Sequence, residues 1–378
     1  MKDRMDLEKQ DGVADFLNEC EKIVHSSEKM ILFGSAKCAE KVYLFILGLG
    51  LWDNVHYVLD NDVMKCGQSF HGKAIYLPDQ MISSINDYVI VIASGSAHII
   101  KKQLESMGIS QEKLYEFPFT NLQFSPTPFE QIMEKEDEFQ ETYSLLEDEK
   151  SRNVYESLLN YKISRNIEWL RDISDDEGDQ YFDREIIKLS DVETFVDCGA
   201  YVGDTLQEFC IRTGNRYKKY ICFEADEDVC DVLRKNVRSW NLDNIDIHNT
   251  GCWDKKDKLR LNIQGSGTSF ITGEETGKII CADSLDNMLL EIPITFVKMD
   301  IEGAEENALR GMRNVIKKYK PTLAVSIYHS VKDFWYLPQL IKKIFPEYKL
   351  YIRHYRRLSD SETVCYAIPP PRQSSETR

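Results

Sequence analysis

The chain has 378 residues, 42% of them hydrophobic, so it is long enough to form two domains with cores of their own. Its formal net charge of −16 argues against a nucleic-acid partner, because a protein that binds a polyanion normally presents a basic face. No run approaches the roughly 18 apolar residues of a membrane span, and the N-terminus lacks the apolar stretch of a secretion signal. We therefore expect a cytoplasmic protein without a membrane span.

The first 120 residues alternate helix and strand patterns in the way of a small Rossmann-like domain. Apolar residues recur at helical spacing over residues 11–29, and residues 29–34 then read as a strand. Gly34 opens the turn after this strand. Ala36, however, stands where a dinucleotide-binding turn has its second glycine, so its methyl group would press against a pyrophosphate.

Three functions stay open for this domain. A second strand ends in Asp60, 26 residues after Gly34, and residues 70–75 and 108–109 continue the pattern. Residues 29–117 thereby resemble the nucleotide-sugar-binding N-terminal domains attached to some bacterial sugar-modifying enzymes, which implies a nucleotide-sugar ligand. The alternatives are a packing module that forms a homodimer and a working dinucleotide site.

A proline-broken stretch over residues 117–128 marks the end of the first domain. Residues 129–173 follow as one or two acidic helices, which we interpret as a solvated helical linker region within residues 121–180. At the other end of the chain, residues 371–378 predict a disordered tail.

The stretch from Thr194 to Thr205 organises the second domain, residues 181–370. An apolar strand ends at Asp197, and Gly199 and Gly203 allow the backbone to turn tightly into a helix over residues 204–213. A second strand ends in Glu224, 25 residues after Gly199. A carboxylate at this spacing can accept hydrogen bonds from the hydroxyls of a ribose.

Two further strands carry ionisable residues at their carboxyl ends. Residues 294–300 end in Asp300, with Glu302 two residues on, and residues 322–329 end in His329. The carboxyl ends of parallel strands meet at one edge of a sheet, where open α/β folds bind their ligands. A polar, glycine-rich loop over residues 264–269 either closes over an acceptor or is an ordinary hairpin turn.

Three of these stretches resemble the FkbM-type S-adenosylmethionine-dependent methyltransferases: residues 195–204, 223–226 and 298–305. The resemblance implies a class I methyltransferase fold, an α/β domain with a mostly parallel seven-stranded sheet and an antiparallel closing strand. It also implies S-adenosylmethionine as the cofactor, with Asp197, Gly199 and Gly203 at its methionine part and Glu224 at its ribose. The cofactor-binding residues that it implies are Tyr181, Phe182, Asp197, Gly199, Ala200, Gly203, Asp204, Glu224, Ala225, Cys252, Trp253 and Asp300.

Methylation of a hydroxyl group benefits from a group that removes its proton. The candidates are His329, Asp300 and Glu302; we favour His329 because an imidazole has a near-neutral pKa. Glu302 can instead cap the helix after Gly303. Two carboxylates and one histidine are too common to predict a metal site, so we predict none. The expected acceptor is a sugar or glycan-related small molecule; the alternative is an NAD-dependent or nucleotide-sugar-binding protein without methyltransferase activity.

Overall fold

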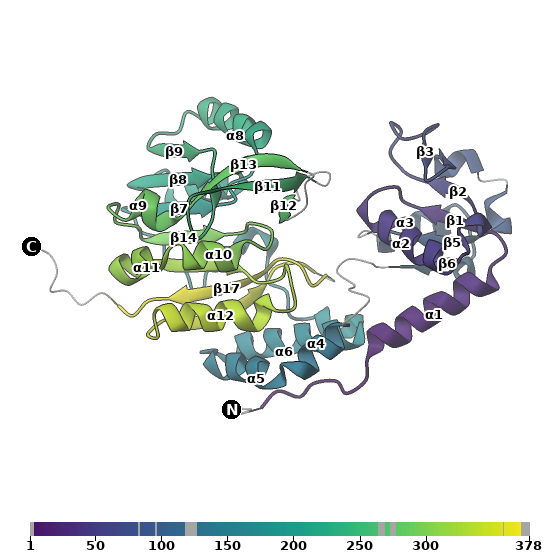
Figure 1. The fold of residues 1–378 in the computed structure, drawn as a ribbon, viewed down its shortest axis with the longest axis horizontal. Helices are drawn as coiled ribbons and strands as arrows, with labels where there is room; N and C mark the ends of the chain where they lie inside the picture. Colours follow the sequence, from purple (N-terminus) through teal and green to yellow (C-terminus); the bar gives the residue numbers. More distant parts are fainter. Residues whose placement is uncertain are drawn as a thin grey trace, which may run out of the picture. The chain divides into compact units, whose positions relative to one another are not determined.

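The computed structural model describes residues 4–81, 84–94, 97–117, 127–263, 269–272, 277–357 and 359–371 (Figure 1). The proline-broken stretch over residues 117–128, the polar loop and the tail fall mostly outside these ranges. The chain divides into two compact units: a small unit of residues 11–127, and a large unit made of the first ten residues and residues 128–378.

The small unit contains a six-stranded sheet in the order β3-β4-β2-β1-β5-β6. The described strand pairs are parallel except for the β3–β4 hairpin, as the α/β pattern predicts. Within this unit the hydroxyl of Thr127 donates a hydrogen bond of 2.7 Å to Asp11, so its two ends lie side by side. Its strands and helices are α1 (Gly12–Ser26), β1 (Met30–Phe33), α2 (Lys37–Gly48), β2 (Val55–Leu59), β3 (Ser69–Phe70), β4 (Lys73–Tyr76), β5 (Val89–Ile92), α3 (Ala97–Ser106) and β6 (Leu114–Glu116).

The large unit begins with a segment that crosses helices far along the chain. The backbone N–H of Met5 donates to Gln140, and that of Glu8 donates to Asn160. These partners lie in α5 (Glu136–Leu145) and α6 (Glu149–Ser164), which follow α4 (Pro128–Glu134). The structure differs here from the predicted solvated linker, because most of α6 is buried and packs on the sheet.

The main sheet of the large unit has seven strands in the order β16-β17-β15-β14-β7-β8-β9. Strand β17 runs antiparallel to both neighbours and the other described pairs are parallel, which confirms the predicted methyltransferase-type sheet. Figure 1 shows β9, β8, β7, β14 and β17 in this order across the unit. The strands are β7 (Thr194–Cys198), β8 (Lys219–Phe223), β9 (Ile245–His248), β14 (Phe296–Met299), β15 (Thr322–Ser326), β16 (Lys349–His354) and β17 (Thr363–Ile368).

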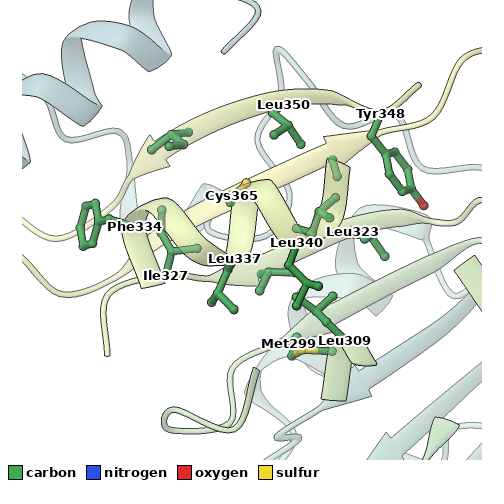
Figure 2. Packing of buried hydrophobic residues seen from close by; sticks show 14 of the residues in the cluster. Met299, Leu309, Leu323, Ile327, Phe334, Leu337, Leu340, Tyr348, Leu350 and Cys365 are labelled. Atoms are coloured by element: carbon green, nitrogen blue, oxygen red, sulfur yellow. The ribbon is translucent and has the colours of Figure 1, made fainter. Parts of the chain in front are cut away.

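Helices cover both faces of this sheet, because its buried strands carry apolar side chains on each side. Phe195 and Tyr220 pack toward α7 and α8, whereas Val196 and Met299 pack toward α9 to α12. Figure 2 shows part of the core between the sheet and the helices α9 to α12, where Leu337 and Leu340 of α12 lie over Leu323 and Cys365. The helices are α7 (Asp204–Thr213), α8 (Glu227–Trp240), α9 (Leu285–Leu289), α10 (Glu305–Arg310), α11 (Arg313–Tyr319) and α12 (Asp333–Ile344).

A second, four-stranded sheet follows β9 in the order β10-β13-β11-β12. Among the described helices, none has the length and apolar character to cross a membrane. The strands of this four-stranded sheet are β10 (Gly251–Cys252), β11 (Asp257–Ile263), β12 (Ser269–Thr272) and β13 (Lys278–Asp283). Short 3-10 helices of the two units lie at Trp52–Asn54, Pro78–Met81, Ile85–Asp87, Gln111–Lys113, Ile167–Leu170 and Glu177–Asp179.

Candidate active site

The glycine turn after β7 is wedged between two neighbouring strand ends. Gly199 has φ +84°, and an added Cβ would lie 1.9 Å from the carbonyl oxygen of Asp300. The backbone N–H groups of Gly199 and Ala200 both donate to the carbonyl of Phe223 at 3.0 Å. Glycine is required at this position because the turn leaves no room for a side chain.

Asp197, just before this turn, is locked into a buried ion pair. Its carboxylate lies 3.1 Å from Lys298 Nζ and accepts a 2.7 Å hydrogen bond from the Tyr220 hydroxyl. Burial raises the pKa of Asp197; it also opposes the charge on Lys298, but the nearby Asp197 and Asp300 raise the pKa of the amine above its ordinary value. Lys298 also donates to the Gly199 carbonyl at 2.7 Å. With no exposed surface of its own, Asp197 holds the glycine turn in place in this conformation.

Glu224 lies at the end of β8, as the spacing predicts. Its carboxylate accepts hydrogen bonds from the backbone N–H groups of Tyr201 at 3.0 Å and Asp226 at 2.9 Å. Burial raises its pKa, while these two hydrogen bonds oppose the shift. The carboxylate therefore ties the glycine turn to the start of α8, on the same edge of the sheet.

Beyond the adjacent strands, β14 and β15, lie the residues that we call the Asp300 cluster: Asp300, Glu302, Glu305 and His329. His329 Nε2 lies 3.4 Å from a carboxylate oxygen of Asp300 and 3.7 Å from one of Glu302. Its Nδ1 lies 3.3 Å from Glu305, the first residue of α10. The predicted approach of His329 to Asp300 and Glu302 is therefore present.

The cluster changes the protonation of its members. Burial opposes a charged imidazole, but Glu305, Asp300 and Glu302 raise the pKa of His329 to about 10. For Asp300, burial favours the neutral acid, but the charges of His329 and Lys298 lower its pKa below the ordinary value. The predicted near-neutral pKa of His329 is wrong, because its ring lies among three carboxylates, of which the sequence placed only Asp300 and Glu302 at the same edge.

The remaining predicted residues fall into three groups along the same edge. Tyr181 donates from its hydroxyl to Asp300 at 2.6 Å, and Phe182 is buried beneath α7. Gly203, with φ +96°, caps α7, which Asp204 begins. Ala225, just after β8, lies beside Gly251, and Cys252 and Trp253 follow Gly251 directly in the chain. These residues lie along the edge of the sheet at the carboxyl ends of its strands, and their part in cofactor binding stays a prediction.

Two ionisable residues of the site were not singled out from the sequence. Lys298 interrupts the apolar strand from Phe296 to Met299, and a charged residue in a buried strand normally has a partner. Glu305 ends the stretch of residues 298–305 that carries the family resemblance, but it was given no role. The direction of the Glu305 side chain toward His329 depends on the left-handed turn at Glu302 and Gly303 that precedes α10.

In the small unit, the edge of the sheet after β1 and β2 also carries a glycine turn and an acid. Gly34 has φ +114°, and an added Cβ would lie 2.6 Å from the carbonyl oxygen of Ala93. Asp60 accepts a hydrogen bond from the Ser35 hydroxyl and pairs with Lys65 Nζ at 3.1 Å. The acid at the end of the second strand is thus engaged by neighbours within its own unit.

Each unit matches a family of known proteins. Residues 197–356 match the methyltransferase FkbM domain, and residues 26–115 match the C2185-like N-terminal domain. The structure is similar to that of methyltransferase FkbM from Methylobacillus flagellatus, with 20% identity and a TM-score of 0.67, over 97% of this chain and 95% of that one.

Two other similar structures are matched over about half of this chain. An rRNA methylase from Streptococcus thermophilus has 13% identity and a TM-score of 0.33, over 48% of this chain and 90% of its own. Fibrillarin from Aeropyrum pernix, solved with S-adenosylmethionine, has 11% identity and a TM-score of 0.33, over 49% and 71%. A comparison with curated proteins finds no significant match.

Proposed function

Because the chain carries a methyltransferase domain of the FkbM family at residues 197–356, we propose that it methylates a hydroxyl group of a sugar or glycan-related small molecule. The proposed methyl donor is S-adenosylmethionine. When bound, this cofactor supplies a methyl group on a positively charged sulfur. The alternative of a binding protein without methyltransferase activity is disfavoured by the family match.

The observation that carries the proposal is the excess of carboxylates beside the glycine turn. Asp300, Glu302 and Glu305 surround a single histidine, and the turn of Gly199 contacts the Asp300 backbone directly. Opposite charges attract strongly where burial limits screening by water. An edge of this composition suits a sulfonium cation.

Other residues would hold the rest of the cofactor. Glu224 is placed to accept hydrogen bonds from the ribose hydroxyls, in exchange for part of its present bonding to Tyr201. The N-terminal end of α7 suits the carboxylate of the methionine part, since that helix begins at the glycine turn. Cys252 and Trp253 would border the adenine.

A hydroxyl acceptor fits the same edge. The cluster offers carboxylate oxygens that accept hydrogen bonds from hydroxyl groups, and the net charge of −16 disfavours a polyanionic acceptor. Asp300, Glu302 and His329 stay the candidates for taking up the hydroxyl proton. His329 must first release its own proton, which the three carboxylates around it oppose.

Calorimetry on the full chain tests the cofactor, and a methyl-labelled donor tests the reaction. We expect S-adenosylmethionine and S-adenosylhomocysteine to bind, NAD to bind far more weakly, and label to appear in hydroxylated sugar acceptors. A folded chain that binds neither sulfur compound would contradict the proposed cofactor. Labelling of amines but not of hydroxyl compounds would contradict the proposed acceptor.

A further inference from the structure

We propose that Asp300, Glu305 and His329 form a binding site for a divalent metal ion. One ligand atom from each residue lies within 4.8 Å of the others. Ligand atoms around one ion at about 2.1 Å lie up to about 4.2 Å apart, so small side-chain shifts would complete the site. The chemical role of the ion rests on the proposed function, but the ion-binding site itself does not depend on that function.

The two strands and the helix behind these ligands fix their backbones. Asp300 directly follows β14, His329 follows β15, and Glu305 is the first residue of α10. Strands β14 and β15 are parallel neighbours in the middle of the sheet. The ligands therefore come from a rigid part of the fold, where a metal site can be held with little rearrangement.

Two of the side chains are buried without the hydrogen bonds that burial normally requires. The His329 side chain is 9% exposed, and neither ring nitrogen makes a well-oriented hydrogen bond within the described ranges. The Glu305 side chain is 1% exposed, and its Oε2 likewise lacks a partner among the described residues. The ring nitrogens contact the carboxylates only as ion pairs of 3.3 to 3.7 Å. Buried polar groups are almost always hydrogen-bonded, so atoms without such bonds indicate a ligand between them.

Neighbouring groups orient both carboxylates, and Oε2 of Glu305 has no hydrogen-bond partner among the described residues. The Tyr181 hydroxyl donates to Oδ2 of Asp300 at 2.6 Å, and the backbone N–H of Ile301 donates to Oε1 of Glu305 at 2.8 Å. The second oxygen of Asp300 faces His329, with the Tyr328 hydroxyl 3.4 Å from it. Groups that orient a metal ligand in this way are typical of metal sites.

The composition of the site indicates which ions it would accept. Two carboxylates and one imidazole form a mixed oxygen and nitrogen set, which suits a divalent transition ion such as Mn²⁺ or Zn²⁺ better than Ca²⁺. Three ligands on one side leave positions for water or for a substrate oxygen. Glu302, 33% exposed and 3.7 Å from His329, lies at the more open side.

This arrangement gives the ion a role in the proposed reaction. A hydroxyl oxygen bound to a divalent ion loses its proton more readily and is held in one place. Glu302 is the carboxylate next to the site that can receive this proton and pass it to water. The ion would therefore perform the activation that a lone His329, surrounded by three carboxylates, performs poorly.

Titration of the metal-free full chain with Mn²⁺ tests the site, with free Mn²⁺ followed by electron paramagnetic resonance. We expect one saturable ion per chain. Asp300→Asn and Glu305→Gln should each weaken binding by about 100-fold, and Tyr181→Phe, which keeps every ligand, should weaken it by about 10-fold to 100-fold. Circular dichroism checks that each variant is folded.

Glu306→Gln is the matched control. It removes the same charge from the next position of α10, but Glu306 points to Arg310 and Lys332 and should leave Mn²⁺ binding unchanged. No Mn²⁺ binding, or binding that ignores all three test substitutions, would overturn the site. Calorimetry with S-adenosylmethionine on the same samples separates the proposals: normal cofactor binding without Mn²⁺ binding rejects the metal site alone, and the reverse result rejects the proposed cofactor alone.

Discussion

The small unit and the large unit each place a left-handed glycine directly after the first strand of a mostly parallel sheet. An added Cβ would lie 2.6 Å from a carbonyl oxygen at Gly34 and 1.9 Å from one at Gly199. In both units the glycine is needed because a neighbouring strand end lies against the turn. The glycine therefore reports close packing in each case and does not by itself identify a ligand site.

The two edges differ in their ionisable residues. Beside Gly34, Asp60 pairs with Lys65, whose side chain is partly exposed to solvent. Beside Gly199, a fully buried Asp197 pairs with Lys298, and the Asp300 cluster gathers three carboxylates around one histidine. Buried charge is costly to maintain. Its concentration at one edge only is what distinguishes the candidate active site from a structural turn.

Removal of the buried cation should give the largest effect. Lys298→Met leaves Asp197 charged inside the sheet, so we expect the free energy of unfolding of the large unit to fall by about 3–5 kcal/mol. Lys65→Met removes the partly exposed counterpart and should change the stability of the small unit by about 1 kcal/mol or less. Urea unfolding, with each unit's transition followed separately, measures both. Equal losses would contradict the difference drawn between the two edges.

The two glycine turns can be compared in the same way. Gly199→Ala should destabilise the large unit by about 2–4 kcal/mol, because it combines a left-handed backbone with a backbone collision. Gly34→Ala should have a smaller effect on its unit. Gly214 has φ +58° with no atom within 4 Å, so Gly214→Ala is the control for conformation alone, at about 1 kcal/mol. If Gly199→Ala costs no more than this control, the contact with Asp300 is not the cause.

Affinity for S-adenosylmethionine should change with a substitution at the sheet edge of the large unit but not with one at the sheet edge of the small unit. Glu224→Ala should weaken S-adenosylmethionine binding by about 1.5–3 kcal/mol, the range for hydrogen bonds to a charged acceptor. Asp60→Ala, an acid at the equivalent strand end of the small unit, should leave this affinity unchanged. Calorimetry provides both values. An unchanged affinity in folded Glu224→Ala would remove this residue from the ribose site, and a loss in Asp60→Ala would bring the small unit into cofactor binding.

Acidification should affect the large unit through His354. Its ring is buried, with Nδ1 2.9 Å from the Thr363 hydroxyl, and burial lowers its pKa to about 4. The unfolded chain takes up the proton near pH 6.5, so this contribution to stability is complete above that pH and is lost as the pH falls toward 4. Between pH 8 and pH 5 His354 alone should cost about 2 kcal/mol, while His329, whose pKa is raised, gains stability over the same range. The wild type should therefore lose about 2 kcal/mol relative to His354→Gln between these pH values; parallel profiles would contradict the assignment.

Local patterns in the sequence predicted the parts of the fold that depend on neighbours along the chain. The buried strands and the order of glycine, Glu224 and Asp300 follow from apolar periodicity and spacing, whereas the antiparallel β17 was implied by the family resemblance. The ion pair of Lys298 with Asp197 joins residues far apart in the chain, and such pairs leave no local signal. The protonation of His329 was predicted wrongly for the same reason, since Glu305 reaches it only through the turn before α10.

The burial of α6 also depended on distant residues. Its apolar stripe was visible in the sequence, but the sequence did not show that the first residues of the chain would cross it. Asn160, in the middle of the helix, is fully buried and bonds to the backbone of both Asp6 and Glu8. An acidic, amphipathic segment between two domains was therefore interpreted as a linker when it forms part of a core.

The paired ends of the small unit make it an insertion into another domain's sequence. Because the residues before Asp11 already belong to the large unit, the chain leaves that unit, folds 11–127 and returns beside its point of departure, where Thr127 meets Asp11. An insertion whose ends meet costs its host little more than a short loop does. Such a module can be gained, exchanged or lost as one piece, so the large unit would keep both parts of its interrupted fold if a short turn joined residue 10 to residue 128.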